Sequence, residues 1–154
     1  MHERVIPHLL KATREVFETM VFIPLQPERP VHGMETETAA HVVASVAFAG
    51  ERSGLVAFHA ETDTARQIAG AMLGMPATDV DGEMTDAMGE VANMIAGGFR
   101  LALKSTGTDV AIAVPTVITG SDFRTKYVTP VTRVLCPFRL ENGGRVFVEL
   151  IVNE

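Results

Sequence analysis

Hydrophobic residues at helical spacing divide the chain into three amphipathic segments. The first covers about residues 7–21, the second residues 61–73, and the third residues 81–104. Gly74 and Gly107 follow the second and third segments, where glycine commonly ends a helix. The pattern therefore predicts three helices, and the third is the longest.

Runs rich in valine and alanine predict the strands. Two lie at residues 41–49 and 54–60, joined by a polar turn. Three more lie at about residues 111–118, 127–140 and 146–152, and the prolines at 24, 27 and 30 indicate a loop. Because the strands come in runs instead of alternating singly with helices, the pattern predicts an α+β fold with helices on a mostly antiparallel sheet.

The third helix has chemically distinct faces at about 100° per residue. A polar stripe of Asp86, Glu90, Asn93 and Gly97 falls within about 60° on one side. A solvated helix face would explain that stripe, although Asn93 and Gly97 are poor helix formers. Small residues on a third face would let another element approach closely: Thr85, Gly89, Ala92 and Ala96. The opposite face is apolar or small: Met84, Met88, Val91, Ile95, Gly98, Phe99 and Ala102.

Composition limits the classes of protein that fit. A chain of 154 residues, 47% hydrophobic and 21% charged, predicts one ordered domain over residues 1–154. The net charge of −6 argues against a non-specific nucleic-acid binder. The single cysteine, Cys136, lies in an apolar run and is interpreted as a buried structural thiol. With no signal-peptide pattern and no apolar run of roughly 20 residues, we expect a cytoplasmic protein without a membrane span.

The sequence contains no motif for nucleotide binding or for a metal site. A P-loop and a Gly-x-Gly-x-x-Gly run are both absent, so nucleotide binding by those motifs is not expected. The chain has no cluster of metal ligands, and we expect no metal centre. Its histidines are scattered, which favours surface or hydrogen-bonded roles: His2, His8, His32, His41 and His59.

The run from Asp86 to Gly98 resembles the signature helix of the CheC/CheX/FliY response-regulator phosphatases. That pattern has an Asp or Ser, a Glu four residues later, an Asn three after it, and a Pro some two dozen residues further on. Asp86, Glu90 and Asn93 fit it, and Pro115 comes about one residue early. The likeness covers most of the chain, and the presence of one signature helix indicates the CheX-like branch.

The resemblance implies a CheC-like fold whose long signature helix is exposed. It implies a phosphatase that hydrolyses the aspartyl phosphate of a CheY-like receiver, with Asn93 orienting the water and Glu90 docking the receiver's lysine. Asp86, Gly97 and Met94 are candidates for partner binding. The Mg²⁺ ion would belong to the receiver. Relatives form homodimers through their sheets, so we expect a dimer and take the last strand, residues 146–152, as a possible edge.

Two other hypotheses stay open. One is a noncatalytic module of the same fold that binds a receiver or a motor-switch protein. The other is a structural dimer with no receiver partner. The presence of both Glu90 and Asn93 favours the enzyme, and a measured dephosphorylation rate would separate the three.

Overall fold

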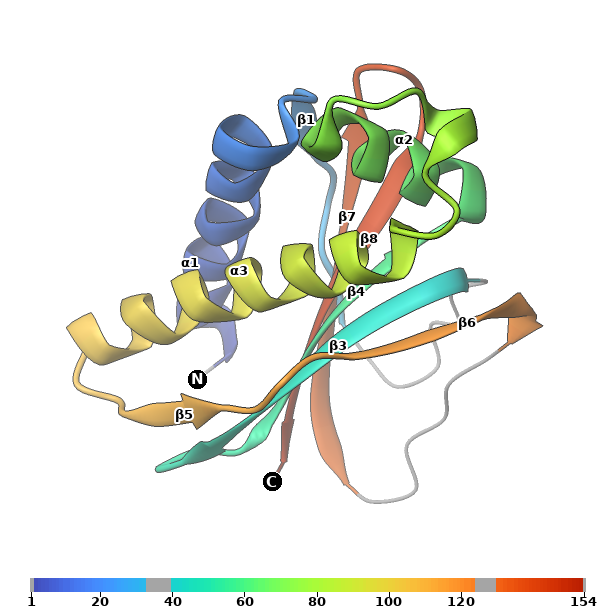
Figure 1. The fold of residues 1–154 in the computed structure, drawn as a ribbon. Coiled ribbons are helices and arrows are strands. Elements are labelled where there is room, and N and C mark those ends of the chain that lie inside the picture. The colour runs from blue at the N-terminus through green and yellow to red at the C-terminus, as the bar shows by residue number, and fades with distance from the viewer. Residues whose placement is uncertain (1, 33–39, 124–129, 154) are drawn as a thin grey trace.

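The computed structural model describes residues 2–32, 40–123 and 130–153 (Figure 1). The helical elements are α1 (His2–Val16), the π-helix η1 (Phe17–Val21), α2 (Thr62–Leu73), the short 3₁₀-helix η2 (Ala77–Asp79) and α3 (Met84–Ser105). The strands are β1 (Leu25–Pro27), β2 (Val31–His32), β3 (Ala40–Gly50), β4 (Gly54–Ala60), β5 (Val110–Ile112), β6 (Thr116–Phe123), β7 (Val131–Leu140) and β8 (Arg145–Asn153). Among these residues, no helix is both long enough and apolar enough to cross a membrane.

The described strands form one sheet of eight in the order β1-β7-β8-β4-β3-β5. β2 also pairs with β7, and β6 also pairs with β3. Each of these pairings is antiparallel, which confirms the predicted α+β class. The prediction of an edge strand at residues 146–152 is wrong, because β8 lies between β7 and β4. Among the described strands, the edges of the sheet are instead β1 and β2 on one side and β5 and β6 on the other.

The core lies between one face of the sheet and the three α-helices (Figure 1). Side chains alternate across a strand, so every second residue of the four central strands faces the helices. Leu9, Ile68 and Phe99 meet them from α1, α2 and α3. Each such side chain stabilises the fold by about 1.5–3 kcal/mol. The strand residues are Val42, Ala44, Val46, Phe48, Val56, Phe58, Ala60, Val134, Cys136, Phe138, Leu140, Val146, Val148, Leu150 and Val152.

The helices differ from the prediction mainly at their ends. α1 starts five residues before the predicted residue 7, with Pro7 inside it. Pro7 has no N–H to donate, yet the helix continues because Val5 and Leu9 are buried on either side. α2 ends where expected, since Gly74 adopts a left-handed φ of 66° and its N–H bonds to the Gly70 carbonyl. α3 begins at Met84 instead of residue 81.

The segment predicted as a proline-rich loop contains the short strands β1 and β2. Both pair with β7 at an edge of the sheet, where proline is tolerated because one side of the strand needs no donor. The predicted strand at residues 111–118 is divided into β5 and β6 by residues 113–115. The first part of the predicted strand 127–140 lies outside the described residues, and β7 begins at Val131.

Cys136 is fully buried on the helix-facing side of β7, as predicted for a structural thiol. Burial raises the pKa of this thiol to about 12. Because the thiolate is the reactive form, Cys136 is chemically inert in the folded protein.

On the other face of the sheet, three charged or titratable side chains are buried together. Nε2 of His59 lies 3.2 Å from Oε1 of Glu149, and Nε of Arg133 donates to Oε2 of the same carboxylate. Nδ1 of His59 is buried without a hydrogen-bond partner among the described residues. Burial alone raises the pKa of Glu149, but the hydrogen bond and charge of His59 and the charge of Arg133 together bring it below its ordinary value.

We predict that this cluster makes the stability of the fold depend on pH. A lowered pKa favours the carboxylate in the folded state, so its stabilisation is present above the unfolded pKa of about 4.3 and is lost as the pH falls through the folded pKa. Glu149→Gln should lower the free energy of unfolding by about 3 kcal/mol at neutral pH, because the buried guanidinium of Arg133 loses the negative charge of Glu149. It should also flatten the dependence on pH in acid.

Urea denaturation at a series of pH values measures both effects. Glu141→Gln, at an exposed position in the turn before β8, is the matched control and should leave the curve unchanged. A Glu149→Gln variant as stable as wild type at neutral pH would contradict the prediction.

Candidate functional site

Helix α3 is enclosed on three sides (Figure 1). Its apolar face lies on the sheet, where Met88, Val91 and Ile95 are fully buried. α1 crosses it at Gly98, where an added methyl group would lie 3.1 Å from Cβ of Ala12. This approach is so close that a residue larger than glycine would force α1 to move.

The third side of α3 faces the segment from β5 to β6. A methyl group at Gly89 would lie 3.4 Å from Cγ2 of Val117 and 3.7 Å from Cγ of Pro115. Further along, Nε of Arg100 donates to the Val110 carbonyl at 3.0 Å. Pro115 therefore packs against α3 at Gly89, the residue before Glu90. The sequence pattern identifies Pro115 only by its spacing from Asn93.

Three of the four small residues predicted on the third face of α3 are packed against neighbouring elements. Gly89, Ala92 and Ala96 are buried, whereas Thr85 is exposed at the start of the helix. The predicted third face of the helix is therefore confirmed from Gly89 onward.

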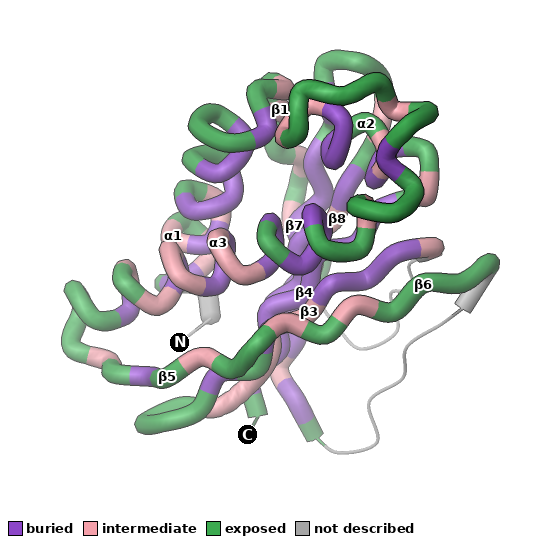
Figure 2. The backbone as a smooth tube through the Cα atoms, viewed as in Figure 1, coloured by how far each residue is buried: buried purple, intermediate pink, exposed green. Residues whose placement is uncertain are grey.

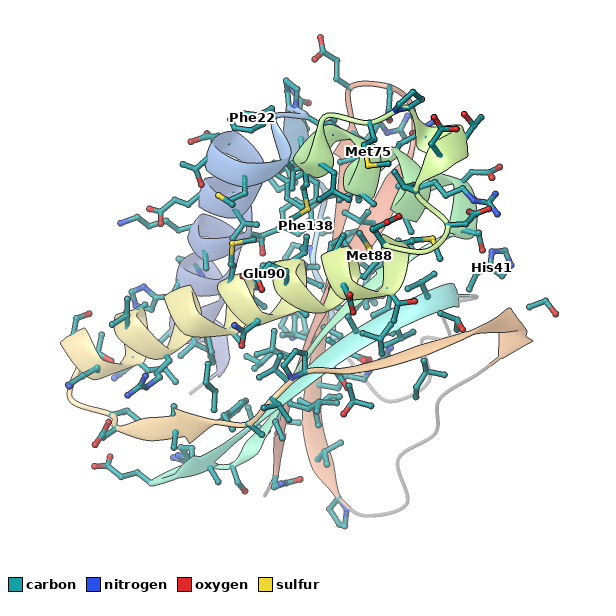
Figure 3. The ribbon with its side chains drawn as sticks, viewed as in Figure 1. Phe22, His41, Met75, Met88, Glu90 and Phe138 are labelled. Carbon is teal, nitrogen blue, oxygen red and sulfur yellow. The ribbon has the colours of Figure 1, made fainter. Side chains whose placement is uncertain are left out.

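The fourth side of α3 carries the polar stripe and is open (Figure 2). Asp86 and Glu90 are exposed, and Asn93 and Gly97 are half-buried. Glu90 lies along the middle part of the helix (Figure 3). All four predicted stripe residues thus lie on one side of the helix. Glu90 and Asn93 are on neighbouring turns, where Cβ atoms are typically about 5–6 Å apart.

The stripe side chains have no partners within the described part of the chain. Neither a hydrogen bond nor an ion pair is formed there by Asp86, Glu90 or Asn93. A methyl group at Gly97 would meet no atom within 4 Å. The stripe is a convex ridge that offers a carboxylate acceptor and an amide with both donor and acceptor atoms. Such a ridge suits insertion into a concave site on another protein better than it suits enclosing a small substrate.

Two apolar residues border the stripe. Met94, a predicted partner-binding residue, is half-buried and packs partly against the core, so only part of its side chain remains accessible. Leu101 follows Gly97 by one turn and is 67% exposed. The sequence analysis did not single out Leu101, although its place on the helical wheel, about 60° from Asp86, could have identified it.

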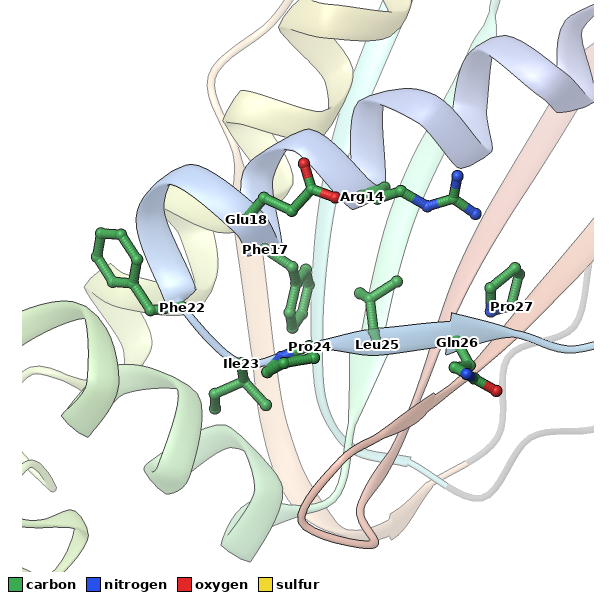
Figure 4. Close-up of a pocket in the computed structure, with 9 residues that line it drawn as sticks. All are labelled: Arg14, Phe17, Glu18, Phe22, Ile23, Pro24, Leu25, Gln26 and Pro27. Carbon is green, nitrogen blue, oxygen red and sulfur yellow. The ribbon is translucent and has the colours of Figure 1, made fainter.

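A groove that the sequence analysis missed lies between η1 and β1 (Figure 4). Its volume is about 650 Å³, and Phe17, Phe22 and Leu25 line it together with Arg14 and Glu18. Phe22 is 69% exposed and holds a left-handed φ of 62°, which is unusual for a bulky residue. No residue of the α3 stripe lines this groove.

The described residues contain no group of three or more His, Cys, Asp or Glu side chains that could hold a metal ion. Of the scattered histidines, His59 differs from the expectation of a surface or fully hydrogen-bonded residue, because it is buried with one ring nitrogen unpaired. It lies on β4 in the charged cluster behind the sheet and not on the α3 stripe.

The chain is similar to known chemotaxis proteins. The family described as "Chemotaxis phosphatase CheX" matches residues 42–139. The CheY-P phosphatase CheX of Thermotoga maritima is 27% identical over 127 residues, which cover 82% of each chain. The crystal structure of chemotaxis protein CheX from Desulfovibrio desulfuricans is 30% identical, with a TM-score of 0.89 over 97% of this chain and 99% of that one.

A third relative is known in a complex. The CheX chain in a CheX–CheY–BeF₃–Mg²⁺ structure from Borrelia burgdorferi is 24% identical, with a TM-score of 0.82 over 97% of each chain. At that identity the likeness concerns the fold. The family match, however, includes all of α3 and β4 and most of β3 and β7, and it extends over more than half of the sequence. The chain therefore belongs to the CheX family of chemotaxis phosphatases.

Proposed function

We propose that this protein hydrolyses the aspartyl phosphate of a CheY-like receiver domain in the cytoplasm, and that its 154 residues act as one domain. The observation that supports this most strongly is the pairing of Glu90 and Asn93 on neighbouring turns of an exposed helix, with no partner among the described residues. Membership of the CheX family, and a relative named as a CheY-P phosphatase, point to the same reaction.

In this proposal Asn93 positions the attacking water. Its amide oxygen accepts a hydrogen bond from the water and its NH₂ group donates to a neighbouring acceptor, which together fix the water in line with the phosphorus. Phosphoryl transfer is catalysed mainly by positioning and by charge stabilisation, so an amide on a rigid helix is sufficient for this role. Burial of the opposite face of α3 holds the amide in place.

Glu90 docks the receiver. Its carboxylate would pair with the lysine that a receiver carries beside its phosphorylated aspartate. This contact would place Asn93 over the phosphoryl group. Asp86 and Met94 would contact the edges of the same interface. Gly97 leaves open space above the helix, so a loop of the receiver could approach the backbone there.

We assign any Mg²⁺ ion to the receiver, where it would neutralise charge on the phosphoryl group. The Borrelia burgdorferi relative was captured with CheY, BeF₃ and Mg²⁺ together. The stripe offers two carboxylates, Asp86 and Glu90, and the described residues contain no group of three His, Cys, Asp or Glu side chains there. In this proposal the residues of this chain therefore position the water and dock the receiver.

The central test is Asn93→Ala. Phosphate release from a phosphorylated receiver of the same organism should accelerate with wild type and slow by about 100-fold or more with the variant, since the water is no longer oriented. The melting temperature should not fall, because the position is partly exposed and alanine is the better helix former. If wild type binds the receiver without changing its rate of dephosphorylation, the noncatalytic module becomes the better hypothesis.

Glu90→Ala tests the docking role separately. We expect KM for the phosphorylated receiver to rise by about tenfold to 100-fold, the effect of losing one charge-assisted contact, with a smaller change in kcat. Glu51→Ala removes the same charge from the exposed β3–β4 turn and serves as the control. A variant that loses kcat at unchanged KM would show that Glu90 acts in the chemical step instead.

We also propose that the protein is a homodimer joined at the free edge of β6, where Ile118 is 52% exposed. Light scattering should give twice the mass of one chain, and Ile118→Lys should yield the monomer. Val31→Lys, at an exposed valine on the opposite edge of the sheet, should leave the dimer intact. A monomeric wild type at micromolar concentration would contradict this assembly.

A further inference from the structure

Three segments that are distant in sequence enclose a second cavity, of about 550 Å³, at the end of the molecule where α3 finishes. α1 contributes Arg4, Val5 and His8, and the β3–β4 turn contributes Arg52. The last turn of α3 and the residues after it contribute Leu103, Thr106 and Thr108. None of these residues belongs to the α3 stripe or takes part in the proposed reaction.

The polar groups of this cavity are mostly donors. Two guanidinium groups, from Arg4 and Arg52, and the imidazole of His8 line it in a chain whose net charge is −6. No carboxylate occurs among its described lining residues. Glu51 and Asp109 lie next to it, joined by a backbone hydrogen bond of 3.3 Å, but neither lines the cavity.

The two guanidinium groups and the imidazole also lack side-chain partners. Within the described part of the chain, Arg4, His8 and Arg52 form no ion pair or hydrogen bond with a side chain. Several arginines elsewhere are paired, Arg66 with Asp63 and Asp81 and both Arg139 and Arg145 with Glu28, although the exposed Arg14 forms no ion pair among the described residues either. The cavity therefore brings together two guanidinium groups that no carboxylate among the described residues pairs with.

The floor of the cavity is apolar and well fixed. Val5 and Leu103 are almost fully buried beneath it. Hydrogen bonds fix the C-terminal end of α3. The Thr106 hydroxyl donates to the Leu103 carbonyl at 2.8 Å, and the Thr108 N–H donates to the same oxygen at 3.0 Å. Two arginines, a histidine and two threonines surround this small apolar floor, so the lining is more polar than that of a typical small-molecule pocket and suits an anionic ligand.

We propose that this cavity binds a small molecule that carries a phosphate group, held between Arg4 and Arg52, with a non-polar part against Val5 and Leu103. The planar guanidinium group is the side chain best matched to phosphate oxygens, and here two of them come from different walls of one cavity. A long polyanion is disfavoured because the whole molecule is acidic, whereas a small anion senses mainly the local charge.

Titration of the full chain with pyrophosphate, and then with ATP in metal-free buffer of low ionic strength, tests the proposal by NMR. Both probes should shift the amides of residues 4–8, 52 and 106–108 in a saturable way. ATP should bind more tightly than pyrophosphate, because its base adds apolar contact with the floor. Adenosine, which has no phosphate, should leave these amides unshifted.

Arg4→Ala and Arg52→Ala should each weaken binding about tenfold, the loss of one charge-assisted hydrogen bond to the anion. Arg14→Ala, an exposed arginine further along α1, carries the same charge change and should bind as wild type does. The proposal is wrong if no phosphate probe gives saturable shifts at millimolar concentration, or if both arginine variants bind unchanged. It is also wrong if a polyglutamate peptide shifts these amides while pyrophosphate does not. All of these results are independent of the phosphatase activity.

Discussion

The close contact of α3 with its neighbours at two glycines governs the whole arrangement. At Gly98 the helix meets Ala12 of α1, and at Gly89 it meets Pro115 and Val117 beside β6. With the sheet beneath it, these contacts leave one side of α3 free, and that side carries Glu90 and Asn93. The backbone positions of the two residues are fixed during folding, so an encounter with a partner has only the side-chain rotamers left to order.

The candidate site could be predicted from sequence because its geometry is local. Glu90 and Asn93 are three residues apart on a regular helix, and their common face follows from the helical repeat alone. The apolar face and the small-residue face of α3 follow in the same way. Hairpin strands β3 and β4 were found at nearly the correct bounds for a similar reason, since valine-rich runs and the polar turn between them are adjacent in the chain.

What could not be predicted depends on residues that are distant in the chain. The order of strands places β8 inside the sheet. The nearly continuous apolar run of residues 146–152 fits a strand buried on both faces, but the neighbours of that strand in the sheet are set by distant parts of the chain. The contact of His59 with Glu149 joins residues that are 90 positions apart. β1 and β2 were missed because the prolines that indicate a loop are also tolerated at a sheet edge. The cavity at Arg4 and Arg52 requires the packing of α1 beside the end of α3, which periodicity does not specify.

The place of β8 has a consequence for how the protein is made. β4 and β7 are joined in the sheet only through β8, which the ribosome produces after both of them. Until that strand emerges, α1 and α3 have only part of a surface to pack on, and their apolar faces remain in contact with water. We therefore expect a nascent chain to stay unfolded until synthesis has passed Asn153, and then to fold in one cooperative step.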